Sequence, residues 1–175
     1  MEELDIQATL DRIAGQGLSP IERILAAHTG TVQLLVSLWF GETADAVVKY
    51  QREYPEPTPG GEIRRTVALT LRHRQLEVVS ADTLIPLTGN DPAVLKFVRA
   101  RVLGLGQIAV YLGIPTKREI LSLLVKPDYI VRKYRMTDGG HGPALHFIIE
   151  ETFPRRLYAA QSPALAQAGL DGYGS

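Results

Sequence analysis

The sequence predicts an α+β fold in which helices pack on one face of an antiparallel β-sheet. Strand-like segments come in pairs separated by short polar turns, which is typical of β-hairpins. Helix-like segments gather between the hairpins and do not alternate singly with strands, which disfavours a parallel doubly wound sheet. The 175 residues show no internal repeat, so we expect a single domain over residues 1–175. Its ordered core is predicted at about 18–158 and a frayed tail at 159–175.

Two helices are predicted near the N-terminus. Ser19 is suited to cap the first, because Pro20 then takes the first helical position and Glu22 the first turn. The inward residues of this helix would be Ile21, Ile24 and Leu25. Thr31 is predicted to cap a second helix that ends at Gly41. Its inward residues would be Val32, Leu35, Val36 and Trp39.

A strand is predicted at 47–54, followed by an exposed loop at 55–61 that holds three prolines and two glycines. Strands at 62–71 and 76–87 should then form a hairpin through the polar turn between them.

The second half of the chain should add helices and a final hairpin. A helix opens at 90–92, with Val94, Leu95, Val98 and Val102 on its inner face. Residues 104–106 are expected to interrupt the helical structure. Residues 107–112 and 115–124 are each expected to be helical in part. Strands at 129–136 and 144–153 close the domain.

Two charged residues fall in apolar rows of these strands. Side chains alternate across a strand, so Arg65 shares a face with Ile63 and Val67, while Arg64 belongs to the polar face. In the last strand, Glu151 shares a face with apolar residues and Glu150 does not.

A buried charge costs several kcal/mol unless it is paired and hydrogen-bonded. Three interpretations of Arg65 and Glu151 stay open at this point. They form a buried salt bridge, they lie at strand ends and reach solvent, or they line a pocket that grips a carboxylate.

The composition narrows the class of protein. Lys plus Arg and Asp plus Glu number 19 each, and this zero net charge argues against a nucleic-acid partner. The absence of cysteine excludes disulfides and fits a reducing compartment. The first 18 residues have no apolar run, which argues against a secretory signal, and no stretch approaches the roughly 20 apolar residues of a membrane span. We therefore expect a cytoplasmic protein that does not insert into a membrane.

Four stretches, taken together and in order, resemble the chorismate pyruvate-lyase (4-hydroxybenzoate synthase) family. Residues 18–41 resemble its opening helices and the mobile turn between them. Ile63-Arg64-Arg65-Thr66-Val67, followed by Ala81-Asp82-Thr83-Leu84-Ile85-Pro86, resembles its central hairpin. Leu105-Gly106, followed by Thr116-Lys117-Arg118-Glu119-Ile120, resembles its middle segment, and Glu151-Thr152-Phe153-Pro154 its closing strand. The resemblance spans about 18–158 and implies a chorismate lyase-like fold.

The resemblance also implies roles for particular residues. Arg65 would grip the carboxylate of the substrate, with Arg64 beside it. Glu151 would contact the ring hydroxyl and the departing group. Glu150 is the alternative, because alignment of the family pattern to Pro154 without a gap places the glutamate at that position. The backbone amide of Leu105, next to Gly106, would supplement the arginine, and the turn near Gly30 would contact the ligand.

One position departs from the family pattern. Bacterial members of the ubiquinone pathway carry a second arginine in the return strand of the hairpin, where this chain has Asp82. Losing that cation would weaken binding of a dianion such as chorismate, and Arg118, Arg132 or Arg64 would have to compensate.

The activity implied is the cofactor-free conversion of chorismate into 4-hydroxybenzoate and pyruvate, in ubiquinone or other quinone biosynthesis. No metal is predicted, because the 4 histidines lack metal-ligand spacing. We expect a monomer or weak homo-oligomer. Two alternatives stay open: a related enzyme of secondary metabolism acting on another carboxylate, and a non-catalytic module that binds a small aromatic acid. Regulators with such a module normally carry a helix-turn-helix, which the residues before Ser19 are too few to form.

Overall fold

Six antiparallel strands form one sheet with the order β1-β2-β3-β6-β5-β4. The computed structural model describes residues 11, 13–55, 60–140 and 142–159. The strands are β1 (Ala44–Tyr54), β2 (Glu62–Leu71), β3 (Glu77–Pro86), β4 (Lys117–Val125), β5 (Tyr129–Thr137) and β6 (His146–Pro154). The helices are α2 (Pro20–Ala27), α3 (Val32–Phe40), α4 (Pro92–Ala100), α5 (Leu105–Tyr111) and α6 (Arg155–Ala159).

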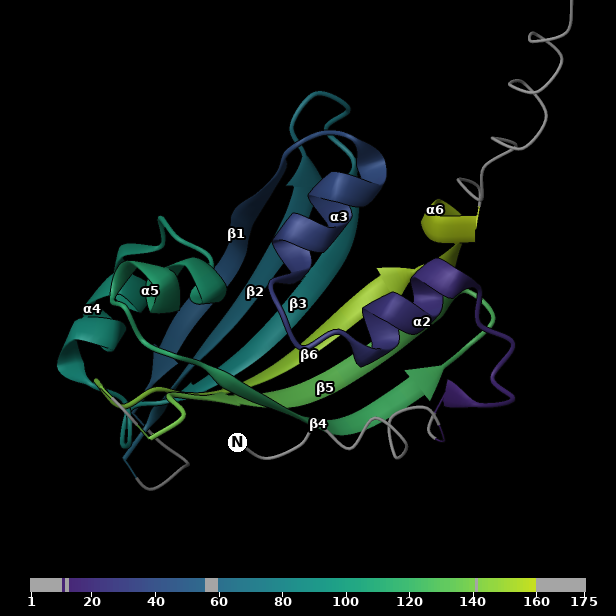
Figure 1. The fold of residues 1–175 in the computed structure, drawn as a ribbon. Helices are drawn as coiled ribbons and strands as arrows, with labels where there is room; N and C mark the ends of the chain where they lie inside the picture. Colours follow the sequence, from purple (N-terminus) through teal and green to yellow (C-terminus); the bar gives the residue numbers. More distant parts are fainter. Residues whose placement is uncertain (1–10, 12, 56–59, 141, 160–175) are drawn as a thin grey trace, which may run out of the picture.

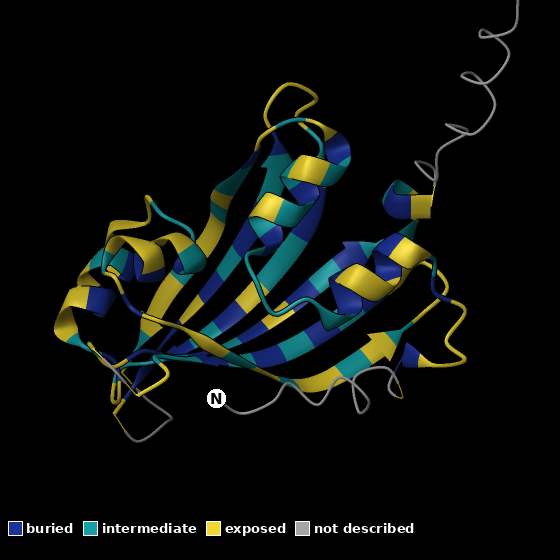
Figure 2. Cartoon of the chain, in the orientation of Figure 1, coloured by how far each residue is buried: buried dark blue, intermediate teal, exposed yellow. Residues whose placement is uncertain are grey.

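The sheet curves strongly, and the helices lie on its concave side (Figure 1). Helix α3 contacts β1, α2 and α6 contact β5, and α4 packs against α5. Buried positions, drawn in dark blue, recur along β2, β3, β5 and β6 and in each helix (Figure 2). The predicted α+β class, with helices on one face of an antiparallel sheet, is confirmed.

Two apolar clusters fill the space between helices and sheet. One joins α2, α3 and α6 to the sheet through residues such as Leu25, Val36 and Tyr158. The other joins α4 and α5 to the sheet through residues such as Val98, Ile108 and Phe147. Burial of this apolar area is the main force that holds the helices on the sheet.

The predicted start of the first helix is confirmed. Ser19 caps α2 and accepts a hydrogen bond from the Glu22 amide, while the Glu22 side chain accepts one from the Ser19 amide. Glu22 is also buried against Arg155, at 2.6 Å from carboxylate oxygen to guanidinium nitrogen. This ion pair ties the start of α2 to the start of α6. The predicted end of α3 is confirmed as well, because Gly41 adopts a left-handed conformation with φ of 70°.

Several local predictions were wrong. Residues 117–125 are the edge strand β4, because their backbone pairs with β5. The expected break at 104–106 is the start of α5, with Gly104 as its N-cap residue. Ile24 and Val102 are 49% and 73% exposed, so neither faces the core. Thr31 precedes α3 as predicted, but its side chain makes no capping hydrogen bond. Residues 160–175 of the predicted tail and 56–59 of the predicted loop lie outside the described residues, while Ala159, the first residue of that tail, ends α6.

Candidate ligand-binding site

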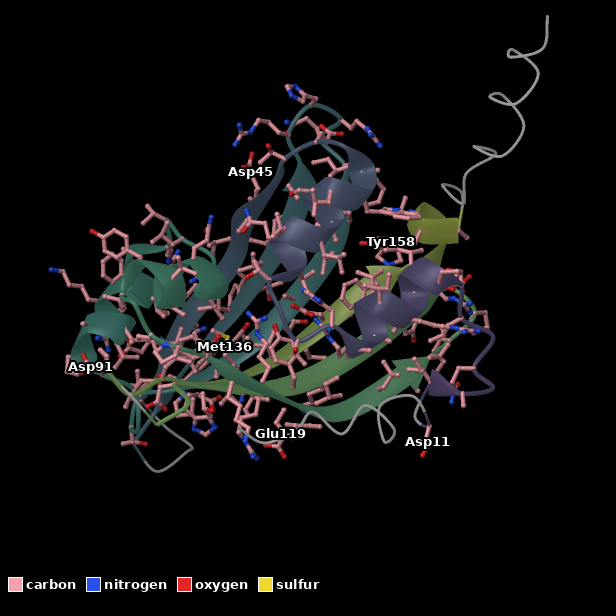
Figure 3. All side chains as sticks on the ribbon, viewed as in Figure 1. Asp11, Asp45, Asp91, Glu119, Met136 and Tyr158 are labelled. Atoms are coloured by element: carbon pink, nitrogen blue, oxygen red, sulfur yellow. The ribbon has the colours of Figure 1, made fainter. Side chains whose placement is uncertain are left out.

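A cavity of about 90 Å³ lies on the concave face, where the two apolar clusters meet. Val32 and Val79 come from one cluster, and Leu105 and Ile149 from the other. Met136, which is labelled in Figure 3, also lines the cavity. The polar and charged residues of its wall are Thr31, Gln33, Thr83, Gln107, Arg118, Tyr134 and Glu151. The cavity is therefore mostly apolar with a few polar groups, as small-molecule sites usually are.

Glu151 is the acidic residue of this wall, and it is only 6% exposed. One carboxylate oxygen accepts a hydrogen bond from Arg132 at 2.5 Å, and the other accepts one from the Tyr134 hydroxyl at 2.9 Å. Burial, together with the nearby Glu151 charge, raises the pKa of the Tyr134 hydroxyl, which stays protonated at neutral pH. The carboxylate is thus held in one orientation by two buried donors.

Arg132 links this carboxylate to the end of α2. It is 1% exposed, and its other terminal nitrogen donates to the carbonyl oxygens of Leu25, at 2.8 Å, and of His28. The rings of Tyr134 and Phe153 lie 5.1 and 5.7 Å from its guanidinium carbon. The buried pair is therefore Arg132 with Glu151, and the salt bridge between Arg65 and Glu151 that the sequence left open does not form.

Arg65 projects from β2 on the same face and is 1% exposed. Its one hydrogen bond in the described part of the chain joins a terminal nitrogen to the Leu103 carbonyl oxygen at 2.5 Å. The other terminal nitrogen and Nε are buried without a partner there. Burial, with a smaller effect of the nearby Arg101 charge, lowers the pKa of Arg65 to about 10, which still leaves it charged at neutral pH.

Arg65 lies beside the cavity, on the same face of β2 as Val67, and is not itself one of the residues of the wall. It is directly opposite Thr83 on β3, and both Thr83 and the next residue on its own face, Val67, belong to the cavity wall. Glu151 lies opposite Ala81, which in turn lies opposite Val67. Two strand spacings of about 4.8 Å and a step of two residues therefore separate Arg65 from Glu151, roughly 12 Å between their Cα atoms. The two predicted charges therefore lie on the same face of the sheet, Glu151 in the cavity wall and Arg65 next to it.

The turn between α2 and α3 is held over the cavity from β4. Arg118 lines the cavity, and its Nη1 donates to the carbonyl oxygens of Thr29, at 2.6 Å, and of Gly30. A Cβ atom on Gly30 would lie 2.6 Å from the ring of His28, so a larger residue there would have to displace that ring. Gly30 thus lies near the site, as predicted, while its neighbour Thr31 supplies the wall.

The remaining predicted site residues divide between the two faces of the sheet. Leu105 and Gly106 line the cavity from α5. Arg64 and Glu150 instead lie on the opposite face, and both are exposed. Arg64 pairs there with Glu62 at 2.6 Å. The prediction that Arg64 adjoins the site is therefore wrong, and of the two neighbouring glutamates only Glu151 points inward.

Asp82 also lies on the opposite face, where it accepts a hydrogen bond from Thr66 at 2.6 Å. The residue that departs from the family pattern is therefore separated from the cavity by the sheet. Its carboxylate places no negative charge inside the site.

Tyr134 was not among the predicted site residues, and Arg132 was predicted only as a compensating charge. The alternation that singled out Arg65 also places Arg132 and Tyr134 in the buried row of β5, between Ile130 and Met136. The same period of two in that strand therefore indicates both residues.

Within the described ranges, no group of three or more His, Asp or Glu side chains is placed to hold a metal ion. Over the same ranges, none of the helices has the length and apolar character needed to cross a membrane.

Protonation of His28 is expected to loosen the turn. Burial lowers its pKa, and the charges of Arg132 and Arg118 lower it further, against smaller opposing effects of a hydrogen bond at Thr31 and the Glu151 charge. The unfolded chain then binds a proton near pH 6.5 that the folded chain does not. The contribution of neutral His28 to the free energy of unfolding should be fully present above about pH 6.5 and fall as the pH decreases below that value.

We expect His28→Gln to reduce this acid-side loss, seen as a smaller change of Tm, by a few degrees, between pH 7.5 and pH 5.5. The exposed His73, replaced in the same way, is the matched control. Identical pH profiles for wild type and His28→Gln would contradict the prediction.

Comparison with known proteins gives matches among solved structures alone. No protein-family model matches the chain, and no curated protein matches it. Among solved structures, it is similar to the ligand-binding domain assigned to a GntR-family transcriptional regulator from Bordetella bronchiseptica. The two share 12% sequence identity with a TM-score of 0.43, over 63% of this chain and 85% of the other.

Proposed function

We propose that the protein is a chorismate pyruvate-lyase of the cytoplasm, which converts chorismate into 4-hydroxybenzoate and pyruvate without a cofactor. The observation that carries the proposal is the pair of guanidinium nitrogens on Arg65 that have no partner among the described residues and are buried on the same face as Glu151. A buried guanidinium without partners is costly, and a bound carboxylate would accept two parallel hydrogen bonds from it. The resemblance of residues 18–158 to the lyase family supports the same conclusion.

The chemistry requires orientation more than a strong catalyst. The ether bond between the ring and the enolpyruvyl group breaks, and a proton leaves the adjacent ring carbon. That proton reaches the methylene carbon of the departing enolpyruvate, which becomes pyruvate, while the ring becomes aromatic. Arg65 would hold the ring carboxylate, and the Leu105 amide would assist it.

Glu151 would face the ring hydroxyl and the carbon that loses its proton. Both of its oxygens already accept hydrogen bonds, from Arg132 and Tyr134, so the carboxylate is fixed before the ligand arrives. A fixed anion of this kind suits a hydrogen-bond acceptor or a general base. Closure of the apolar wall around the ring would exclude water and would make release of the aromatic product slow.

The test is to incubate the purified protein with chorismate. We expect pyruvate, measured by coupled reduction to lactate, and 4-hydroxybenzoate, measured by chromatography, in equal amounts and above the spontaneous rate. Arg64→Gln is the control, because this arginine lies on the far face and its loss should leave turnover unchanged. Absence of pyruvate above background would overturn the proposal.

A second candidate is a non-catalytic module that binds a small aromatic acid. The occupied oxygens of Glu151 favour it, since a buried ion pair can be purely structural. Calorimetric binding of 4-hydroxybenzoate, with chorismate left unchanged, would support this candidate over the lyase.

A further inference from the structure

We infer that Arg118 is the specificity-determining residue for a second anionic group on the ligand, separate from the carboxylate held by Arg65. The inference rests on the proposed function in one respect, namely that the cavity binds an organic acid. It adds a residue on β4 that recognises the second negative charge, which a dianionic substrate has and a monoanionic product lacks.

The charges at the cavity and directly beside it favour a ligand with two negative charges. Arg118 lines the cavity, Arg65 and Arg132 are buried beside it on the same face of the sheet, and Glu151 is the acidic residue of the wall among the residues described. Because the pKa of His28 is lowered and that of Tyr134 is raised, both are neutral at neutral pH. The cavity and its immediate surroundings therefore carry an excess of two positive charges, which a dianion would neutralise and a monoanion would not.

Arg118 also has nitrogen atoms that its hydrogen bonds to the turn do not use. Its Nη1 is used by the carbonyl oxygens of Thr29 and Gly30, while its Nε is buried without a partner among the described residues. Its Nη2 is 3.7 Å from the place a Cβ would take on Gly106, a residue of the cavity wall. Nη2, which takes no part in the hydrogen bonds to the turn, therefore lies at the cavity wall.

The two arginines approach the cavity from opposite directions. Arg65 lies beside it on β2, whereas Arg118 lines it from β4, the strand at the far edge of the sheet. Arg132, which lies between them on β5, is already paired with Glu151. One ligand can thus present one carboxylate to Arg65 and another to Arg118, with the Glu151 carboxylate between them.

The experiment compares two unreactive ligands of similar shape by isothermal titration. The dianion is 3-(carboxymethoxy)benzoate, and the monoanion is 3-ethoxybenzoate, which lacks the second carboxylate. We expect wild type to bind the dianion at least 10-fold more tightly. Arg118→Gln should weaken the dianion 10-fold or more and change the monoanion less than 3-fold, whereas Arg65→Gln should weaken both.

Two further variants separate recognition from a structural role of Arg118 at the turn. Arg118→Lys keeps the charge and should retain part of the preference for the dianion, and it decides the question if Arg118→Gln does not fold. Arg135→Gln removes an exposed arginine of the neighbouring strand and should leave both affinities unchanged. Wild type without preference, or equal losses of both ligands in Arg118→Gln, would overturn the inference.

Failure of the inference differs from failure of the proposed function. If the preference depends on Arg118 but chorismate yields no pyruvate, the lyase proposal fails and this inference stands. If pyruvate forms and the KM for chorismate is the same in wild type and Arg118→Gln, the lyase proposal stands and this inference fails.

Discussion

Replacing Arg65 with methionine is expected to abolish pyruvate release while making the folded protein more stable. The side chain is buried, and over the described ranges two of its nitrogens have no partner and no carboxylate pairs with its charge. Exchanging such a charge for an apolar group of similar volume should raise the free energy of unfolding by about 1–4 kcal/mol. Loss of a buried contact to a ligand carboxylate should weaken acid binding by about 2–5 kcal/mol, which is roughly 30-fold to several thousand-fold.

The two readouts together separate a ligand-binding arginine from a structural one. Denaturant unfolding gives the stability, and titration with 4-hydroxybenzoate gives the affinity. Arg64→Met is the matched control, since it changes the adjacent residue on the opposite face. An Arg65→Met protein that is destabilised and still binds the acid would show that Arg65 supports the fold and not the ligand.

Arg132→Met is expected to cause the largest loss of stability, about 3–5 kcal/mol in the free energy of unfolding. The substitution leaves the buried Glu151 carboxylate without its cation and the carbonyl oxygens of Leu25 and His28 without a donor. The double variant Arg132→Met with Glu151→Gln should recover part of this loss, because no charge then stays buried and unpaired.

Urea unfolding of the two single variants and the double variant completes the cycle. The exposed pair of Arg72 and Asp45, joined at 2.8 Å, offers the control, and Arg72→Met should cost at most about 1 kcal/mol. Equal effects at Arg132 and Arg72 would mean that the buried network contributes no more than a surface ion pair.

Alternation along strands was enough to find the two residues at the centre of the proposal. Arg65 and Glu151 each interrupt an apolar row, and the structure buries both on the concave face. The same parity separates Glu151 from Glu150, although a count from Pro154 favoured the other residue. A period of two survives in the sequence because one face of each strand is buried and the other is not.

Local patterns in the sequence do not predict which residues Arg65 and Glu151 contact. Pairing of Arg132 with Glu151 depends on β5 and β6 being neighbours, and on the end of α2 lying above them. Arg118 was obscured because residues 115–124 were interpreted as partly helical, so no face was assigned to it. The edge strand β4 is only partly buried on one face, so apolar and polar residues alternate weakly along it. It is a strand because its backbone pairs with β5.

The strand order determines when the site can form during synthesis. Strands β1, β2 and β3 are neighbours along the chain and in the sheet, as are β4, β5 and β6, and the two halves meet only where β3 pairs with β6. The cavity spans this junction, with Val67 and Ala81 on one side and Tyr134 and Glu151 on the other. During synthesis the edge of β3 stays unpaired until the last strand has been made, and no acid can bind before then. Once formed, a bound acid bridges both halves and opposes their separation, so ligand should slow unfolding that begins at this junction.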